Sequence, residues 1–216
     1  MAAASLSLTV EGPAGVIEAL ADHPAADAFA APLGTAVIAH PHPLFGGTMH
    51  NKVVQTLARA YLQCGWRTVR FNFRGVGGSA GAYDEGRGET DDMLAVIGQT
   101  TSPGDALAIA GFSFGAYVAA QVIAHMQPDR AIASVVLVGT AASRFAVPAV
   151  AEALHASTLA VHGELDDVVP LAAALDWARA QSLPVTVVPG GGHFFHGQLP
   201  LLKGLVIRHV RGCAQG

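Results

Sequence analysis

Charged residues are scarce in this chain, and they do not gather in blocks of one sign. Lys, Arg, Asp and Glu make up only 13% of its 216 residues, whereas 51% are hydrophobic, and the formal net charge is −4. This composition excludes a disordered chain and provides no basic surface for nucleic acid or for an anionic membrane. We therefore expect a globular protein that acts on a small molecule, with no nucleic-acid and no membrane partner.

Cysteine is almost absent, since the chain has only Cys64 and Cys213. These two lie far apart and lack the short spacings of zinc ligands, so we interpret them as reduced thiols. No stretch approaches the roughly 18 apolar residues of a membrane span, and the first residues lack the basic start and apolar core of an export signal. The sequence thus predicts an unexported, cytoplasmic protein.

Short apolar runs alternate with helix-length stretches, after an opening segment that predicts an antiparallel hairpin around residues 12–15. The runs are continuous, as in strands buried on both faces. The predicted strands are residues 35–39, 67–71, 106–110, 133–138, 158–161 and 185–188, and the predicted helices are residues 51–64, 89–99, 114–125, 171–181 and 199–211. We therefore predict one α/β domain over residues 1–216, a doubly wound, mostly parallel sheet with helices on both faces. Residues 141–157 are too few for a lid domain.

The pentapeptide Gly111-Phe112-Ser113-Phe114-Gly115 stands between a predicted strand and a predicted helix. A serine on such a turn takes a strained backbone conformation that projects its hydroxyl above the sheet edge. Glycines are needed on either side because a Cβ there would collide with neighbouring backbone. Although short patterns of this kind also arise by chance, the strand and helix flanks favour Ser113 as a nucleophile.

A nucleophilic serine needs a base, and the base needs an acid that orients it. The predicted strand at 158–161 runs into a loop with three acidic residues, at the sheet edge where open α/β folds build their sites. From its position in this loop we predict Asp166 as the acid. Glu164 and Asp167 remain alternatives, and an aspartate here is also a common helix cap.

The base is expected after the last predicted strand, where three glycines precede His193. The glycines allow this loop to curl back over Ser113, which favours His193 over His196. The order Ser113, Asp166, His193 is also the order of the α/β-hydrolase layout, in contrast to other serine-dependent folds.

An oxyanion needs two backbone N–H donors, one from the residue after the nucleophile and one from the loop after an early strand. Phe114 supplies the first. The early loop begins His40-Pro41-His42-Pro43, and proline has no N–H. We predict Leu44, the first residue beyond the second proline, as the other donor, with Phe45 as the fallback.

Three histidines, His40, His42 and His50, raise the question of a metal site. Their spacing does not match known zinc sites, and no Cys, Asp or Glu lies among them. We therefore predict no metal and interpret His40 and His42 as residues that hydrogen-bond their own loop.

The glycine-rich segment at residues 72–81 invites comparison with nucleotide-binding loops. Its spacing fits neither the dinucleotide pattern nor the P-loop pattern, and no Lys follows. We predict instead that Arg74 ties neighbouring loops together through a carboxylate such as Glu89 or Asp92.

Taken together, these motifs resemble the α/β-hydrolase superfamily, specifically its small, cap-poor, dienelactone-hydrolase-like bacterial members. The resemblance runs from the opening hairpin to the C-terminal helix. The matching segments are residues 40–47 (HPHP-x-x-GG), 71–81 (FNFRG-x-G-x-S-x-G), 111–115 (the serine turn), 162–170 (similar to HG-x-x-D-x-x-V-P) and 192–195 (GHFF). It implies a sheet of about 7–8 strands, with Ser113, Asp166 and His193 as nucleophile, acid and base. It also favours Leu44 and Phe114 as the oxyanion donors.

One difference from the dienelactone hydrolases limits which of their properties we expect in this chain. Dienelactone hydrolases use a cysteine nucleophile, whereas this chain has Ser113. Their substrate is therefore not transferred. We expect a serine hydrolase without cofactor that cleaves small carboxylic esters, or thioesters, through an acyl-enzyme. The alternative is a binding or scaffold protein with a silent site, which a fluorophosphonate would not label.

Overall fold

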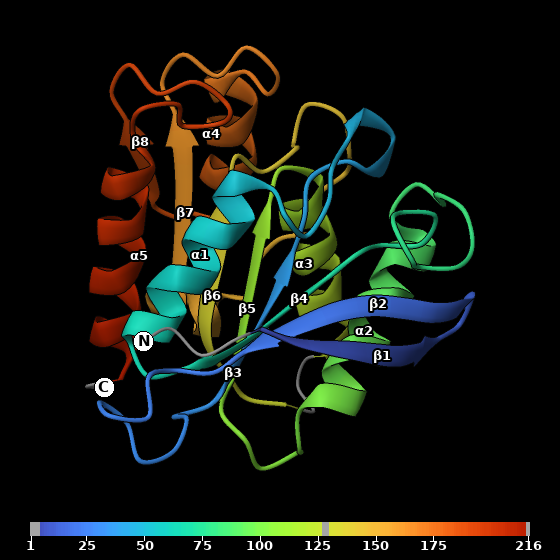
Figure 1. Cartoon of the computed structure of the whole chain (residues 1–216). Coiled ribbons are helices and arrows are strands. Elements are labelled where there is room, and N and C mark those ends of the chain that lie inside the picture. The colour runs from blue at the N-terminus through green and yellow to red at the C-terminus, as the bar shows by residue number, and fades with distance from the viewer. Residues whose placement is uncertain (1–4, 127–129, 215–216) are drawn as a thin grey trace.

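An eight-stranded sheet runs through the centre of the computed structural model, which describes residues 5–126 and 130–214 (Figure 1). Across the sheet the strands follow the order β1-β2-β4-β3-β5-β6-β7-β8. Their bounds are β1 (Leu6–Gly12), β2 (Gly15–Asp22), β3 (Thr35–Ala39), β4 (Arg67–Phe71), β5 (Leu107–Phe112), β6 (Ile132–Val138), β7 (Thr158–Gly163) and β8 (Val185–Val188). Strands β3 to β8 are parallel, and β1 and β2 form an antiparallel hairpin at the edge beside β4. The predicted α/β fold with its N-terminal hairpin is confirmed.

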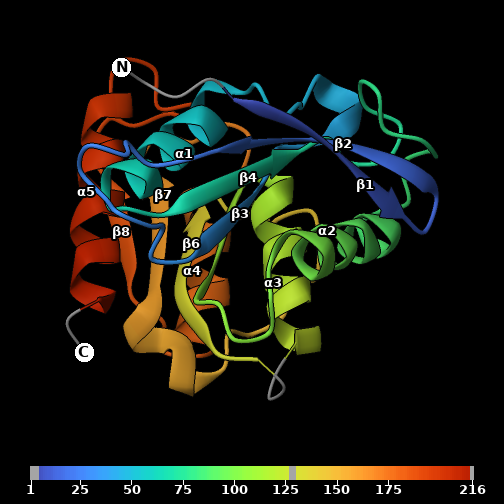
Figure 2. The same ribbon diagram turned by 60° about the horizontal axis from the view of Figure 1, so that its bottom comes forward.

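Helices cover both faces of the sheet (Figure 2). One face packs against α1 and α5, and the other against α2, α3 and α4. The helix bounds are α1 (Lys52–Gln63), α2 (Arg87–Thr100), α3 (Phe114–Met126), α4 (Leu171–Arg179) and α5 (Leu199–Cys213), with short 3-10 helices η1 (Pro43–Phe45) and η2 (Glu152–Ser157). No helix within the described ranges is long and apolar enough to cross a bilayer.

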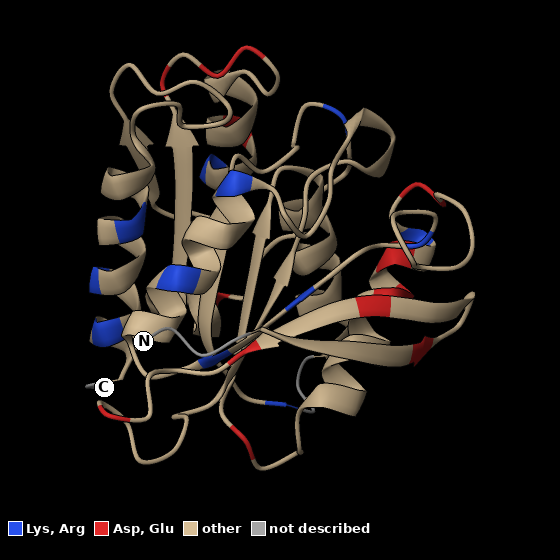
Figure 3. Ribbon diagram, in the orientation of Figure 1, with Lys and Arg blue, Asp and Glu red and all other residues tan. Residues whose placement is uncertain are grey.

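Charged residues are sparse along the described part of the ribbon (Figure 3). Basic residues form a short row on α5, where Lys203, Arg208 and Arg211 follow one another, while most of the central strands carry neither sign. The strands β3 and β5 are buried along their full length, because helices cover both of their faces. The continuous apolar runs in the sequence are therefore explained by burial.

Strand β5 ends two residues later than the sequence pattern predicts. Gly111 and Phe112 still pair in register with Leu137 and Val138 of β6, so the strand runs directly into Ser113. The two 3-10 helices were not predicted, since three to six residues give no measurable helical periodicity. Between β6 and η2 the chain forms a surface loop, and no lid domain is present in the described residues.

The strand order places β3 between β4 and β5, so the connections on its two sides cross opposite faces of the sheet. At such a switch point the loops after the two strands diverge and leave a crevice at the carboxyl ends. The loop at residues 40–51 follows β3, and Ser113 follows β5. This topology brings the two segments together.

An ion pair ties the glycine-rich turn after β4 to α2. The Arg74 guanidinium donates to both oxygens of Asp92 at 2.9 and 2.8 Å, and the Arg74 N–H donates to the same carboxylate at 3.2 Å. Of the two predicted partners, Asp92 is therefore confirmed. Glu89 has another role, because its carboxylate accepts the N–H groups of Asp84 and Gly86 just before α2.

We expect Asp92→Asn to lower the free energy of unfolding by about 3 kcal/mol, because it leaves the Arg74 charge without its partner in a largely buried site. The exposed fractions of the Arg74 and Asp92 side chains are only 12% and 1%. Urea unfolding followed by circular dichroism measures the change.

Asp176→Asn is the matched control, since Asp176 pairs with Arg179 and both side chains are 70% exposed. It should cost less than about 0.5 kcal/mol. Equal effects of the two substitutions would show that the Arg74–Asp92 pair does not stabilise the fold.

Candidate active site

Ser113 occupies a strained turn between β5 and α3. Its φ is 57°, in the left-handed region that non-glycine residues rarely adopt. A Cβ at Gly111 would lie 2.2 Å from the Gly115 oxygen, and a Cβ at Gly115 would lie 2.5 Å from the oxygens of Ala39 and His40. Gly111 is therefore required for the first turn of α3 to lie against the end of β5, and Gly115 for it to approach the end of β3, as the sequence pattern predicts.

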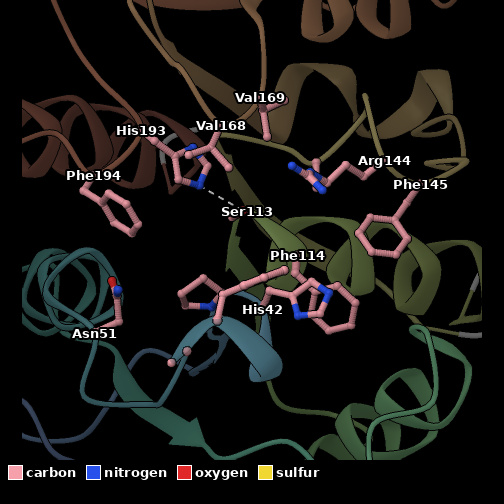
Figure 4. Close-up of a pocket in the computed structure, with 15 residues that line it drawn as sticks. His42, Asn51, Ser113, Phe114, Arg144, Phe145, Val168, Val169, His193 and Phe194 are labelled. Atoms are coloured by element: carbon pink, nitrogen blue, oxygen red, sulfur yellow. Dashed lines mark hydrogen bonds between the residues drawn. The ribbon is translucent and has the colours of Figure 1, made fainter.

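A chain of hydrogen bonds joins three buried side chains from three different loops (Figure 4). The His193 Nε2 lies 3.0 Å from the Ser113 Oγ, and the His193 Nδ1 lies 2.7 Å from the Asp166 Oδ2. Because a carboxylate only accepts, the neutral ring carries its proton on Nδ1 and leaves Nε2 as an acceptor for the serine hydroxyl. The structure thus brings together the three residues predicted as nucleophile, base and acid.

Backbone donors hold the Asp166 carboxylate in place. Its Oδ1 accepts the N–H groups of Val168 at 3.0 Å and Val169 at 2.7 Å. Burial alone would raise the pKa of this carboxyl. The bonds from His193 and Val169, with the nearby imidazoles, outweigh burial and hold the pKa of Asp166 below its ordinary value. The carboxylate therefore stays ionised next to His193.

His162, near the end of β7, contacts the same loop. Its Nε2 lies 2.9 Å from the Val169 oxygen and 3.4 Å from the Asp166 Oδ2, and the ring is buried. Because the Val169 N–H in turn donates to Asp166, the imidazole stabilises the turn whose backbone amides bind the carboxylate. In the sequence, His162 stands out only as the first residue of the segment similar to HG-x-x-D-x-x-V-P, and this pattern alone predicts no role for it.

The alternative acid and base residues lie elsewhere. Asp167 is exposed, and Glu164, also exposed, accepts the Gly190 N–H at 2.8 Å. His196 is exposed beside the Phe194 ring. Among these candidates, only His193 hydrogen-bonds to Ser113, and only Asp166 hydrogen-bonds to His193.

His40 is fully buried and bonded to backbone at both ring nitrogens. Its Nδ1 lies 2.6 Å from the Pro41 oxygen, and its Nε2 accepts the Phe73 N–H at 3.0 Å. It therefore joins the loops after β3 and β4, which confirms the structural interpretation of this residue. Burial, only partly offset by the bond to Pro41, lowers the pKa of His40 to about 4.

The predicted donor Leu44 requires correction. Its N–H donates to the His42 Nδ1 at 3.2 Å, and the N–H of Phe45, the fallback, donates to the His42 oxygen at 3.2 Å. The short helix η1 thus uses both amides, and Leu44 does not line the cleft above Ser113. The prediction passed over His42, which lies between the two prolines and has an N–H of its own.

The amides of His42 and Phe114 remain available. Within the described part of the chain, neither N–H donates to another protein group. Both belong to the segments that meet at Gly115, and the rings of the two residues lie 4.9 Å apart. The sequence could have indicated His42 as a donor, because it is the residue between Pro41 and Pro43 and, unlike them, has a backbone N–H.

A cleft of about 360 Å³ opens above Ser113 (Figure 4). Its walls are mainly apolar and aromatic, and they come from the loops after β3, β5, β6, β7 and β8. The large apolar residues in these walls are Phe45, Phe114, Phe145, Val168, Val169 and Phe194. The cleft suits a small substrate with an apolar part.

The glycine-rich turn after β4 is closed by a carboxylate. Glu18 accepts the Gly78 N–H and the Asn72 side-chain amide, each at 2.8 Å. An acidic group at this position would repel a phosphate, which agrees with the interpretation of the turn as structural. In the described ranges no three His, Cys, Asp or Glu side chains cluster in a way that could hold a metal.

The family of the chain follows from its similarity to known proteins. Residues 42–156, more than half of the chain, match the family described as the alpha/beta hydrolase fold. The chain belongs to the alpha/beta hydrolase family. A serine hydrolase without a lid from Xanthomonas campestris is 38% identical to this hydrolase, with a TM-score of 0.84 over 98% of this chain and 95% of that one.

A second solved structure supports this assignment. A serine hydrolase homologue from Coxiella burnetii is 40% identical to this hydrolase, with a TM-score of 0.78 over 94% of this chain and 96% of that one. An uncharacterized protein of Rickettsia prowazekii is 43% identical over 91 residues. That match spans 41% of this hydrolase and only 38% of the Rickettsia protein.

Gly115→Ala should destabilise the hydrolase by about 1–3 kcal/mol, because the added methyl group has no space against the backbone of β3. Gly98→Ala is the control. Gly98 is an exposed residue of α2 with open space around it, so this change should stabilise by about 1 kcal/mol. Thermal unfolding of both variants measures the difference, and a neutral Gly115→Ala would contradict the close approach.

His40 should make the stability of the hydrolase depend on pH. The unfolded ring accepts a proton near pH 6.5, whereas the folded ring accepts one only near pH 4. The unfolded state therefore binds more protons between these values, and stability falls as the pH drops from 6.5 to 4. This group should account for about 3 kcal/mol of the loss.

His40→Gln tests this, since an amide can replace both hydrogen bonds without titrating. Urea unfolding at pH 7 and at pH 4 should show a smaller loss for the variant, and the difference in loss isolates the His40 contribution. Parallel pH profiles for wild type and variant would contradict the assignment.

Proposed function

We propose that this hydrolase is a serine esterase that cleaves small carboxylic esters, and thioesters as a second class, through an acyl-enzyme at Ser113. The observation that carries the proposal is the unbroken chain of hydrogen bonds from Asp166 through His193 to Ser113, at 2.7 and 3.0 Å. Such a chain activates a hydroxyl that is otherwise a weak nucleophile at neutral pH.

In the first half of the reaction, His193 Nε2 takes the hydroxyl proton as Ser113 Oγ attacks the carbonyl carbon of the ester. The imidazolium that forms is stabilised by the ionised Asp166, whose other oxygen is held by two backbone amides. Collapse of the tetrahedral intermediate transfers the proton from His193 to the leaving alcohol or thiol and leaves the acyl group on Ser113.

The oxyanion of the intermediate would be bound by the backbone N–H groups of Phe114 and His42. This pair replaces the predicted pair of Phe114 and Leu44, because Leu44 donates to His42 instead. Both amides are held by the contact between α3 and the end of β3, so the donors are in place before charge develops.

In the second half of the reaction, His193 removes a proton from a water molecule as its oxygen attacks the acyl carbon. Collapse of the second tetrahedral intermediate breaks the bond to Ser113 Oγ, which takes the proton back from His193, and the acid is released. No step requires a metal ion or an organic cofactor, since the base, its orienting acid and the oxyanion donors all belong to the chain. Esters and thioesters are favoured over amides because alcohols and thiols depart readily, whereas an amine must be protonated as it leaves.

We propose a small ester as the substrate, with no nucleic-acid or membrane partner, and the cytoplasm as the compartment. The two free cysteines, Cys64 and Cys213, support a reducing compartment. The competing function, a ligand-binding protein with a silent site, is disfavoured because a silent site has no need for the aligned His193 and Asp166.

Ser113→Ala should abolish covalent labelling by a fluorophosphonate and lower kcat/KM for esters by about 10⁴- to 10⁶-fold, because the nucleophile is removed. His193→Ala should be nearly as inactive, since no other base of the described residues hydrogen-bonds to Ser113. The assay is hydrolysis of 4-nitrophenyl esters from acetate to decanoate, with a metal chelator present.

His196→Ala is the control, because this exposed ring lies outside the hydrogen-bonded chain, and it should keep near wild-type activity. Circular dichroism checks that each variant is folded. If wild type resisted the fluorophosphonate and hydrolysed no ester or thioester, the silent-site alternative would be correct.

A further inference from the structure

Arg144 is the only charged side chain among the residues that line the cleft in the described part of the chain. It lies on the loop after β6, where Figure 3 shows a single basic band. The residue is exposed, and it forms no ion pair with any carboxylate of the described residues. Figure 4 shows its guanidinium turned inward, toward the space above Ser113. An unpaired cation therefore borders an otherwise apolar site.

The imidazole of His42 supplies a second donor on the same cleft. Because its Nδ1 accepts the Leu44 N–H, the neutral ring carries its proton on Nε2. Within the described residues that Nε2–H has no hydrogen-bond acceptor, although the ring lines the cleft. The rings of Phe45, Tyr83 and Phe114 lie 4.8 to 4.9 Å away and fix its orientation.

The two groups are close enough to influence each other. Burial lowers the pKa of His42, and the positive charge of Arg144 lowers it further. The ring therefore stays neutral at physiological pH, and its Nε2 carries a hydrogen that it can donate to a ligand. Among the described residues, no acidic side chain lines the cleft to neutralise the guanidinium.

We propose that Arg144 and the His42 Nε2–H form an anion subsite, and that the substrate is an ester that carries a carboxylate in addition to the scissile bond. Two guanidinium N–H groups and one imidazole N–H match the acceptors of a carboxylate, which a planar guanidinium binds in a forked geometry. The remainder of such a substrate would lie on the apolar wall formed by residues such as Phe45 and Phe194.

This inference rests on the proposed esterase activity and names its substrate class. It predicts that a negative charge on the ester improves kcat/KM, in a site where an apolar wall alone would favour neutral esters. The effect should weaken with ionic strength, because Arg144 is exposed to solvent.

The test compares matched esters that differ by one carboxylate. On the acyl side the pair is 4-nitrophenyl hydrogen glutarate and 4-nitrophenyl pentanoate. On the alcohol side the pair is 4-acetoxybenzoate and phenyl acetate. For each pair the ratio of kcat/KM, anionic over neutral, is measured for wild type, Arg144→Gln, Arg144→Lys and Arg144→Glu. Dividing by the ratio for a variant cancels the intrinsic reactivity of the esters.

We expect Arg144→Gln to lower the ratio by about tenfold in at least one pair, which identifies the side of the ester that carries the charge. Arg144→Lys should restore part of the preference, and Arg144→Glu should lower it below that of Arg144→Gln. Arg179→Gln removes the same charge from the exposed surface of α4 and should leave both ratios unchanged. Ratios that are the same in wild type and Arg144→Gln for both pairs would overturn the subsite.

A binding measurement separates this inference from the proposed function. In at least one of the matched pairs, Ser113→Ala should bind the uncleaved anionic ester more tightly than its neutral partner by isothermal titration calorimetry, and the added Arg144→Gln change should remove the difference. This result does not depend on turnover, so it stands even if wild type cleaves neither ester. Equal binding of each matched pair, with the glutarate pair titrated in the same way, would overturn the subsite while leaving esterase activity intact.

Discussion

The close approach between the end of β3 and the first turn of α3 is the constraint on which the site depends. Gly115 has no room for a Cβ, which would lie 2.5 Å from two backbone oxygens. This contact fixes the loop that begins at His40 relative to the serine turn, and His40 then bonds to Phe73 of the next loop. The positions of Ser113 Oγ and of the proposed oxyanion donors therefore follow from backbone contacts rather than from flexible side chains.

A second close approach fixes the other half of the site. A Cβ at Gly163 would lie 2.4 Å from the Gly191 oxygen, so the loops after β7 and β8 meet without intervening side chains. Leu165 donates to the same oxygen at 2.8 Å. Asp166 and His193 extend from these two joined loops, which explains how residues 27 positions apart hold a 2.7 Å hydrogen bond.

Long-range features of the fold and site were predictable from sequence, whereas local turn geometry was not. Continuous apolar runs indicate buried parallel strands, and the order Ser113, Asp166, His193 indicates which loops meet, because both patterns depend on residue type and order alone. The choice of Asp166 over Asp167 depends on which carboxylate the backbone amides of the turn surround. Leu44 was predicted wrongly as an available donor because η1 is too short to give a periodic signal, and its hydrogen bonds depend on the path taken between two prolines.

The open mouth of the cleft has a consequence for the fate of the acyl group. Phe45 and Phe194 at the rim are 78% and 43% exposed, and no segment of the described chain covers them. Bulk water thus reaches Ser113 without a conformational change, and it outnumbers any other nucleophile that could compete for the acyl group. In the proposed reaction, the water that releases the acid therefore enters directly through this mouth, and deacylation requires no opening of a lid.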